Sequence, residues 1–254
     1  MKAIPLERIA PAGAGARRLT AIALVAAVFG CARADGREAT DWGEQRRAMV
    51  ATVRAHAAHG PTPISDRVLA TLERVPRHEF VPESMRAASY QDRPLPIGQS
   101  QTISQPYIVA LMTELADVAA GEKVLEVGTG SGYQAAVLAD LGARVYTIEI
   151  VEPLGRAAAR LFEKHGYDTI EARIGDGYAG WPEHAPFDAI LVTAAPTEIP
   201  APLIEQLAPG GRLVVPVGGR YLPQRLTVVE KDGEGATSKR EVLAVQFVPL
   251  TRDP

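Results

Sequence analysis

The chain has 254 residues, 46 % of them apolar and 22 % charged, which is typical of one sizeable globular domain and excludes a disordered protein. Its formal charge of −3 is unevenly distributed: residues 1–40 carry six Lys and Arg against three Asp and Glu, and the remainder carries 21 against 27. Because phosphate backbones are bound by basic surfaces, the acidic remainder predicts no nucleic-acid partner.

The cysteine and histidine content argues against a metal site. Cys31 is the single cysteine, which excludes an intramolecular disulfide and a multi-cysteine metal site. The histidines form no HExxH pattern, so we predict that no metal is bound. They are His56, His59, His78, His165 and His184.

Residues 17–34 have the layout of a secretory signal, with Arg17 and Arg18 ahead of the apolar run Leu19–Gly30 and a small-residue ending. The run is too short to span a bilayer, so we expect no stable membrane association. Two interpretations stay open for residues 1–40: a signal for export, or a disordered extension ahead of a translation start that lies further downstream.

The next part of the chain predicts two short helices that pack as an N-terminal cap, because apolar residues from Trp42 onward recur at helical spacing. Prolines then exclude regular helix, since each lacks an amide donor and restricts the residue before it. We expect an ordered loop region there, with Tyr90 to Gln101 running over the edge of a sheet. The prolines concerned are Pro76, Pro82, Pro94 and Pro96.

After a predicted helix from about Tyr107 to Val118, short apolar runs alternate with helical segments, which is typical of βαβ units and a parallel sheet with helices on both faces. A turn of Asp232-Gly233-Glu234-Gly235 then predicts a closing antiparallel pair. The predicted helices lie near residues 133–140, 153–165 and 201–208. The predicted parallel strands are Lys123–Val127, Arg144–Glu149, Thr169–Ile174, Phe187–Thr193 and Arg212–Val217, and the antiparallel strands are Arg225–Lys231 and Val242–Val248.

A glycine-rich turn follows the first of these strands, with Gly128, Gly130 and Gly132 directly before a helix. Glycine is needed where the chain turns sharply and a ligand approaches the bare backbone. Glu149 ends the next strand, at the position where an acidic side chain can accept hydrogen bonds from both ribose hydroxyls.

The kind of nucleotide can be narrowed from the same turn. A dinucleotide fingerprint would place glycine where this chain has Tyr133, and no P-loop pattern for a triphosphate occurs. S-adenosylmethionine, a nucleoside without phosphates, fits what remains. Gly130 and Gly132 would then leave room for its methionine part.

Two further acidic residues are candidate ligand contacts. Asp176, followed by Gly177, ends the third strand, where it can accept from the adenine amino group; an ordinary Asx-turn is the alternative. Glu126 lies inside the first strand and can bind the glycine turn or a ligand ammonium, and a partly exposed strand residue is the equally weighted alternative.

From about Trp42 to the C-terminus the chain resembles the protein-L-isoaspartate O-methyltransferase family. The matching stretches are VPRHEFVP from Val75, LPIGQSQTISQPYIVALMTEL from Leu95, VLEVGTGSGYQAAVLA from Val124, GDGYAGW from Gly175, PFDAILVTAAPTEIP from Pro186 and FVPLT from Phe247. General S-adenosylmethionine methyltransferases share the glycine turn but lack the stretches that begin at Leu95 and Pro186.

The resemblance implies a Rossmann-like class I methyltransferase domain over residues 41–254, with a mostly parallel, doubly wound sheet. It implies that Ser104 is the active-site serine, beside a wall over the methyl donor formed by Gln101, Thr102 and Ile103. It also supports the cofactor contacts Gly128, Gly130, Glu149, Asp176 and Gly177, and it adds Thr251 as a C-terminal contact.

The activity implied is transfer of a methyl group from S-adenosylmethionine to the α-carboxylate of isoaspartyl residues in damaged proteins. That carboxylate is already ionised at neutral pH, so the protein mainly orients it, and Ser104 donates a hydrogen bond without acting as a nucleophile. An ordinary helix N-cap is the alternative for this serine. The ester then cyclises to a succinimide, whose hydrolysis returns some aspartate.

Two rival functions stay open, namely a class I methyltransferase that acts on a small molecule and a non-catalytic cofactor-binding relative. We expect a monomer in the cytoplasm, where the methyl donor is made. The signal-like segment keeps a periplasmic or exported protein as the alternative.

Overall fold

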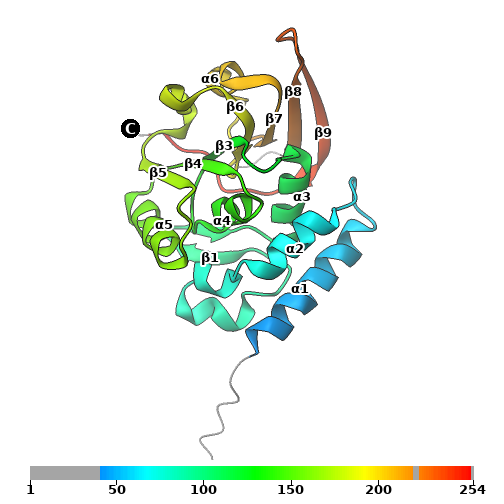
Figure 1. Cartoon of the computed structure of the whole chain (residues 1–254), viewed down its shortest axis with the longest axis vertical. Helices are drawn as coiled ribbons and strands as arrows, with labels where there is room; N and C mark the ends of the chain where they lie inside the picture. Colours follow the sequence, from blue (N-terminus) through cyan, green and yellow to red (C-terminus); the bar gives the residue numbers. More distant parts are fainter. Residues whose placement is uncertain (1–40, 220–222, 253–254) are drawn as a thin grey trace, which may run out of the picture. The chain divides into compact units, whose positions relative to one another are not determined.

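A seven-stranded sheet forms the core of the part of the chain that begins at Asp41 (Figure 1). The computed structural model describes residues 41–219 and 223–252, so the signal-like segment lies outside the described residues. Five neighbouring strands are parallel, in the order β5-β4-β3-β6-β7. They are β3 (Lys123–Val127), β4 (Arg144–Glu149), β5 (Ile170–Ile174), β6 (Phe187–Val192) and β7 (Leu207–Val217).

Two antiparallel strands, β8 (Gln224–Lys231) and β9 (Thr237–Val245), complete the sheet beside β7, as the Asp-Gly-Glu-Gly turn predicts. The chain proceeds outward from β3 through β4 to β5 and then crosses back to β6 on the other side of β3. The strand order therefore reverses at β3. Open α/β sheets bind ligands outside the carboxyl ends of the strands at such a reversal.

Helices cover both faces of the sheet, as the alternating pattern predicts. Side chains alternate along β3, so Val124 packs in the core shared with α1 to α5, and Leu125 and Val127 pack in the core shared with α6. Glu126 consequently lies on the same side as Val124. The helices are α1 (Trp42–Ala57), α2 (Asp66–Arg74), α3 (Pro106–Ala116), α4 (Tyr133–Asp140), α5 (Glu152–His165) and α6 (Ala201–Glu205).

The N-terminal helical cap is confirmed, because α1 and α2 pack with α3 in one buried cluster (Figure 1). Both helices begin at a residue that satisfies a free backbone donor. The Asp41 carboxylate accepts from the backbone N–H of Glu44 at 2.9 Å, and the Ser65 hydroxyl accepts from that of Val68 at 3.4 Å. No helix in the described part of the chain is long and apolar enough to cross a membrane.

The proline-rich stretch contains more structure than a loop. Two short 3₁₀ helices, η1 (Arg77–Phe80) and η2 (Glu83–Ala88), precede a two-stranded hairpin of β1 (Leu95–Gly98) and β2 (Gln101–Ile103). The prediction of an ordered loop region, with Tyr90 to Gln101 running over the edge of a sheet, is therefore wrong from Leu95 onward, where the hairpin forms. The two strands are too short to show an alternating pattern, and their turn lacks the Asn-Gly sequence that marks hairpins.

The bounds of two strands, β9 and β7, also differ clearly from the prediction. β9 begins at Thr237, because its polar first half pairs with β8 through the backbone at the exposed edge of the sheet. It ends at Val245, since the following residues leave the sheet. β7 begins at Leu207, inside the predicted helix over residues 201–208.

Candidate active site

The glycine turn joins the carboxyl end of β3 to α4. Gly128, Gly130 and Gly132 have φ angles of +101°, +52° and +88°, a region that side chains disfavour. A Cβ atom on Gly128 would lie 2.5 Å from the Thr193 hydroxyl oxygen, and one on Gly132 would lie 2.7 Å from the Phe162 ring. The first and third glycines are therefore required by packing as well as by φ.

Glu149 lies beside this turn at the end of β4 and is 6 % exposed. Its Oε2 accepts from the backbone N–H of Gly130 at 2.7 Å, and its Oε1 accepts from that of Val151 at 2.8 Å. The carboxylate thus ties the turn after β3 to the loop after β4. Pairing of the two strands brings together the residues that the sequence assigns to one ligand.

Glu126 is fully buried and lines the same cleft. Its Oε2 accepts from the Thr147 hydroxyl at 2.5 Å, and Thr147 also pairs with the Thr129 hydroxyl at 2.6 Å. Its Oε1 has no hydrogen-bond partner among the described residues. Burial raises the pKa of this carboxyl to about 8, and the nearby Glu149 charge acts in the same direction. The alternative of a partly exposed strand residue is therefore wrong.

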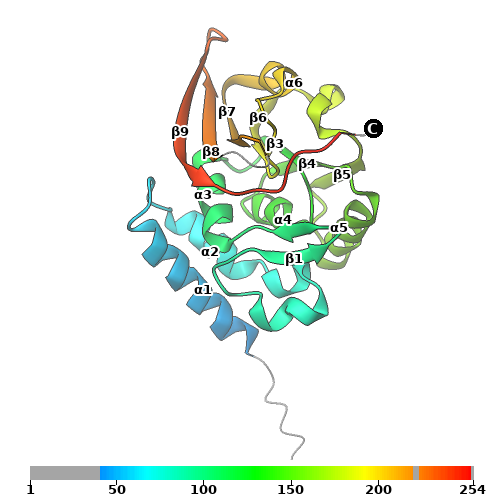
Figure 2. The same ribbon diagram turned by 180° about the vertical axis from the view of Figure 1, so that it is seen from behind.

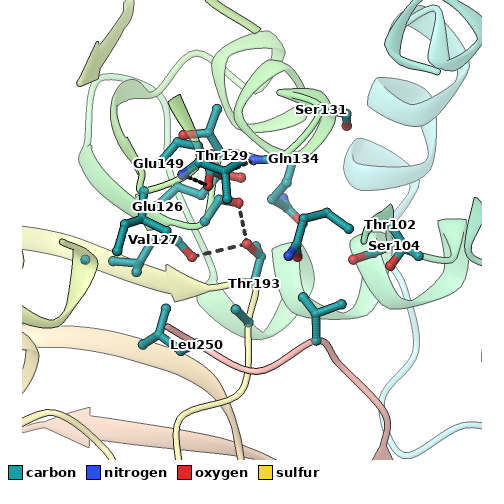
Figure 3. Close-up of a pocket in the computed structure, with 18 of the residues that line it drawn as sticks. Thr102, Ser104, Glu126, Val127, Thr129, Ser131, Gln134, Glu149, Thr193 and Leu250 are labelled. Atoms are coloured by element: carbon teal, nitrogen blue, oxygen red, sulfur yellow. Dashed lines mark hydrogen bonds between the residues drawn. The ribbon is translucent and has the colours of Figure 1, made fainter. Parts of the chain in front are cut away.

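The opposite wall is formed by β2 and the segment that leads into α3. It contains Gln101, Thr102, Ile103 and Ser104 (Figure 3). The N-cap of α3 is Gln105, with no side-chain cap bond, so the alternative of Ser104 as an ordinary N-cap is wrong.

A buried arginine, Arg77, binds the backbone at Ser104. The Arg77 Nη2 donates to the Ser104 carbonyl at 2.7 Å, and Nε donates to the Ser89 carbonyl at 2.8 Å. The guanidinium also lies 4.9 Å from the centre of the Tyr133 ring. Three segments that are distant in sequence therefore meet at this one side chain.

The C-terminal segment forms a third wall of the cleft. Figure 2 shows that after β9 it runs across the sheet toward the β5 side. It is held at Ala195, whose N–H donates to the Val248 carbonyl at 2.8 Å and whose carbonyl accepts from the N–H of Leu250 at 2.9 Å. The Tyr178 hydroxyl donates to the Leu250 carbonyl at 3.2 Å. Thr251, predicted near the cofactor, lies in this wall.

Together these walls enclose about 770 Å³, including space that is open to solvent. Figure 3 shows Glu126 and Glu149 on one side and Thr102 and Ser104 on the other. Most predicted site residues line this one cleft: Gln101, Thr102, Ile103, Ser104, Glu126, Gly128, Gly130, Glu149, Gly177 and Thr251.

Two predicted site residues stand apart from the cleft wall. Gly132 is the N-cap of α4 and packs against Phe162. The Asp176 carboxylate accepts from the backbone N–H of Tyr178 at 2.9 Å at the start of η3 (Gly177–Ala179), which is the geometry of the Asx-turn alternative. Contact of Asp176 with an adenine stays a prediction.

Sequence reasoning missed several residues of the wall. Gln134 follows the tyrosine that begins α4, and Thr129 and Ser131 lie between the glycines of the turn. The last two could have been found, because any residue inside a ligand-binding turn is a candidate. Gln134 gave no such signal, since one polar residue early in a helix is ordinary.

Comparison with known proteins identifies the family. The family model described as protein-L-isoaspartate(D-aspartate) O-methyltransferase matches residues 45–253. The chain belongs to this family. It is 58 % identical, over 82 % of its length and 98 % of the relative's, to protein-L-isoaspartate O-methyltransferase 2 of Polaromonas sp. (strain JS666). It is 52 % identical to protein-L-isoaspartate O-methyltransferase 1 of Cupriavidus necator, over 90 % of each chain.

Solved structures of the family share the fold. One protein-L-isoaspartate O-methyltransferase superposes with a TM-score of 0.73 at 28 % identity, over 80 % of this chain and 65 % of that one. A putative family member from Plasmodium falciparum, in complex with S-adenosyl-L-homocysteine, superposes with a TM-score of 0.70 at 25 % identity, over 82 % of this chain and 99 % of that one. The predicted α/β class I methyltransferase fold is thereby confirmed.

Proposed function

We propose that this member of the family repairs proteins, by transferring the methyl group of S-adenosylmethionine to the α-carboxylate of L-isoaspartyl residues. The observation that carries the proposal is a single cleft in which the glycine turn and Glu149 face the segment Gln101–Ser104. A nucleoside site and an acceptor site are adjacent there, as direct transfer between two bound molecules requires.

The residues present fit the methyl donor. Gly128 keeps the turn open where a side chain would collide, and Glu149 supplies a carboxylate at the end of the second strand. Glu126 offers a fully buried oxygen with no partner among the described residues, suited to a ligand ammonium. No group of three or more His, Cys, Asp or Glu in residues 41–219 and 223–252 is arranged to hold a metal ion, and none is invoked.

The chain's own part in the reaction is placement. When bound, S-adenosylmethionine supplies an electrophilic methyl group on a sulfonium. The Ser104 hydroxyl donates a hydrogen bond that orients the acceptor carboxylate, and Gln101, Thr102, Ile103 and the C-terminal segment limit access of water. Gly130, Gly177 and Thr251 line the donor site that we propose. Gly132 and Asp176 are assigned to it by their positions in the glycine turn and after β5.

The decisive experiment compares two peptides that differ only in an isoaspartyl or aspartyl linkage, incubated with methyl-labelled S-adenosylmethionine. We expect base-labile label on the isoaspartyl peptide alone. Equal labelling of both peptides would favour another methyltransferase of this fold. Binding of S-adenosylhomocysteine by calorimetry without labelling of either peptide would favour a non-catalytic relative.

A serine pair tests the role given to Ser104. Loss of a hydrogen bond to a charged group costs about 1.5–3 kcal/mol, so Ser104→Ala should lower kcat/KM for the isoaspartyl peptide by about tenfold to a hundredfold. Ser238→Ala is the control, because Ser238 is exposed on β9 and does not line the cleft. A similar loss in both variants would argue against a specific role for Ser104.

Localisation and assembly complete the proposal. We propose that the protein acts as a monomer in the cytoplasm, where S-adenosylmethionine is made. An exported form stays the alternative, and mass spectrometry of the native N-terminus distinguishes a cleaved signal from a retained extension.

A further inference from the structure

Gln134 occupies a central place in the cleft without a role in the function proposed above. It is the second residue of α4, is 7 % exposed and lines the cleft. In Figure 3 it lies between the side that carries Glu126 and the side that carries Ser104. A ligand that extends from one side to the other passes this residue.

The orientation of its amide is fixed by a chain of hydrogen bonds in α3. The Thr113 hydroxyl donates to the Val109 carbonyl at 2.7 Å, so its single hydrogen is used. It can then only accept from Gln134, whose Nε2 lies 2.9 Å away. A flipped amide would place two acceptors against each other. The nitrogen is therefore turned into α3, and the oxygen is the polar atom left for the cleft.

The wall around this oxygen favours a cation. Glu126 presents a carboxyl oxygen that is buried without a partner in the described structure, and Glu149 adds a carboxylate. The described residues that line the cleft include no Lys, Arg or His. A buried acceptor without a partner is unfavourable, and a positively charged ligand at this wall would satisfy the Glu126 oxygen.

We infer that the amide oxygen of Gln134 binds the positively charged sulfonium end of the methyl donor. The inference rests on the function proposed above. The oxygen would accept weak C–H hydrogen bonds from the carbon atoms attached to the sulfonium, which are polarised by its charge. The demethylated product has a neutral sulfur and lacks the methyl group. Gln134 therefore favours the donor over the product, and this preference helps product to leave.

The test is the ratio of two affinities measured by calorimetry, for S-adenosylmethionine and for S-adenosylhomocysteine. Gln134→Met keeps the length of the side chain and removes the oxygen. We expect it to weaken donor binding about fivefold to tenfold and product binding less than twofold. Gln134→Glu keeps an oxygen and adds a charge, so it should shift the ratio in the opposite direction.

Thr113→Val is the matched control, because it leaves Gln134 in place and removes the group that orients its amide. We expect a smaller shift of the ratio in the same direction as Gln134→Met. Equal weakening of donor and product by Gln134→Met would overturn the inference, since the contact would be with a part that both share. Unchanged affinities with a raised KM for the peptide would also overturn it, in favour of a substrate contact.

These readouts are independent of the proposed function. If the unaltered enzyme methylates isoaspartyl peptides and the affinity ratio does not move, only the inference about Gln134 fails. If the unaltered enzyme labels neither peptide, the repair function fails, whatever the ratio. Thermal unfolding of each variant confirms that it is folded before titration.

Discussion

At the scale of single residues, burial decides the charge of Glu126. Its carboxyl group has a pKa of about 8, against about 4.5 in an exposed position, so without a bound cation the group is mostly protonated near pH 7. A positively charged ligand beside it would favour the ionised form. The folded state therefore binds a proton that the unfolded state releases above pH 4.5. Stability is lost as pH rises from about 4.5 to about 8 and changes no further above that range.

Glu126→Gln should remove this dependence, because an amide is neutral throughout. One full proton corresponds to about 1.4 kcal/mol for each pH unit, which is the upper limit of the expected slope difference between the two proteins. Urea unfolding at several pH values from 5.5 to 8.5 measures it. Parallel stability curves for the two proteins would show that Glu126 is ionised in the folded state.

Arg77 is a second buried ionisable residue, and it lies next to the Ser104 backbone. Burial lowers its pKa to about 10, so it stays charged at neutral pH, and it contacts carbonyl groups and an aromatic ring. Burying a charge is costly even when it donates hydrogen bonds to two loops. Its presence here favours a role in fixing the geometry of those loops. We propose that Arg77 is a positioning residue for Ser104.

Arg77→Lys keeps the charge but cannot reach both carbonyls in the same fork geometry. We expect kcat for the isoaspartyl peptide to fall about tenfold, as for a loss of roughly 1.4 kcal/mol, with little change in S-adenosylhomocysteine affinity. Arg74→Lys is the control, because Arg74 pairs with Asp140 at the half-exposed surface. Equal losses of kcat and of S-adenosylhomocysteine affinity would indicate a general structural role instead.

The sequence predicts some of these residues and not others, for a physical reason. Glu149 could be predicted, since the end of a strand after a glycine turn has a defined place in a parallel sheet. Arg77 and Gln134 act through contacts with residues 27 and 21 positions away, from segments whose packing no local pattern encodes. Asp176 was assigned by position alone, and its carboxylate already serves a local turn.

At the scale of elements, the hairpin of β1 and β2 carries local strain beside the cleft. Its two turn residues, Gln99 and Ser100, have φ angles of +53° and +57°, which non-glycine residues rarely adopt. The turn is of the kind that favours Asn-Gly. Strand β2 leads directly to Ser104, so the fold contains an unfavourable turn close to the residue that we propose to orient the substrate.

Replacing the turn by Asn-Gly, as Gln99→Asn with Ser100→Gly, should stabilise the protein by about 1 kcal/mol. The relief of left-handed strain, roughly 1–2 kcal/mol for each residue, is partly offset by the greater freedom of glycine in the unfolded chain. Gly98→Ala is the opposite control, because Gly98 has a φ of +92°. Chemical denaturation measures both changes, and a destabilised Asn-Gly variant would contradict the assignment of strain.

The elements could be predicted where the pattern was periodic. The parallel strands follow from their apolar runs, and their order follows from the alternation with helices. The hairpin was missed because each strand is only a few residues long, and the first half of β9 was missed because its exposed side chains are polar. In both cases the strands are defined by backbone hydrogen bonds, and their side chains do not alternate between apolar and polar in a way that would predict a strand.

At the scale of the whole molecule, the cleft is assembled from both ends of the folded chain. The C-terminal segment is fixed to the sheet by Gln224, which exchanges two hydrogen bonds with the backbone of Phe247, at 2.6 and 3.1 Å. The opposite wall depends on the N-terminal cap, because Trp42 of α1 stacks on His78 at 4.4 Å, next to Arg77. We therefore expect that removal of α1 or of the C-terminal segment would affect the site.

This arrangement sets the boundary of the catalytic domain, which we propose to be residues 41–254. Asp41 caps α1, and the buried apolar residues of the described chain all lie at Met49 or beyond. A protein that begins at Asp41 should therefore unfold at the same temperature as the full chain and methylate isoaspartyl peptides at the same rate. A protein that begins at Met49 loses the Asp41 cap and the stacking of Trp42, and it should unfold at a clearly lower temperature with reduced activity. Calorimetry and the peptide methylation assay compare the three proteins.

Equal stability of the two shortened proteins would show that the first two turns of α1 do not support the site. A loss of stability already in the protein that begins at Asp41 would place the domain boundary within residues 1–40.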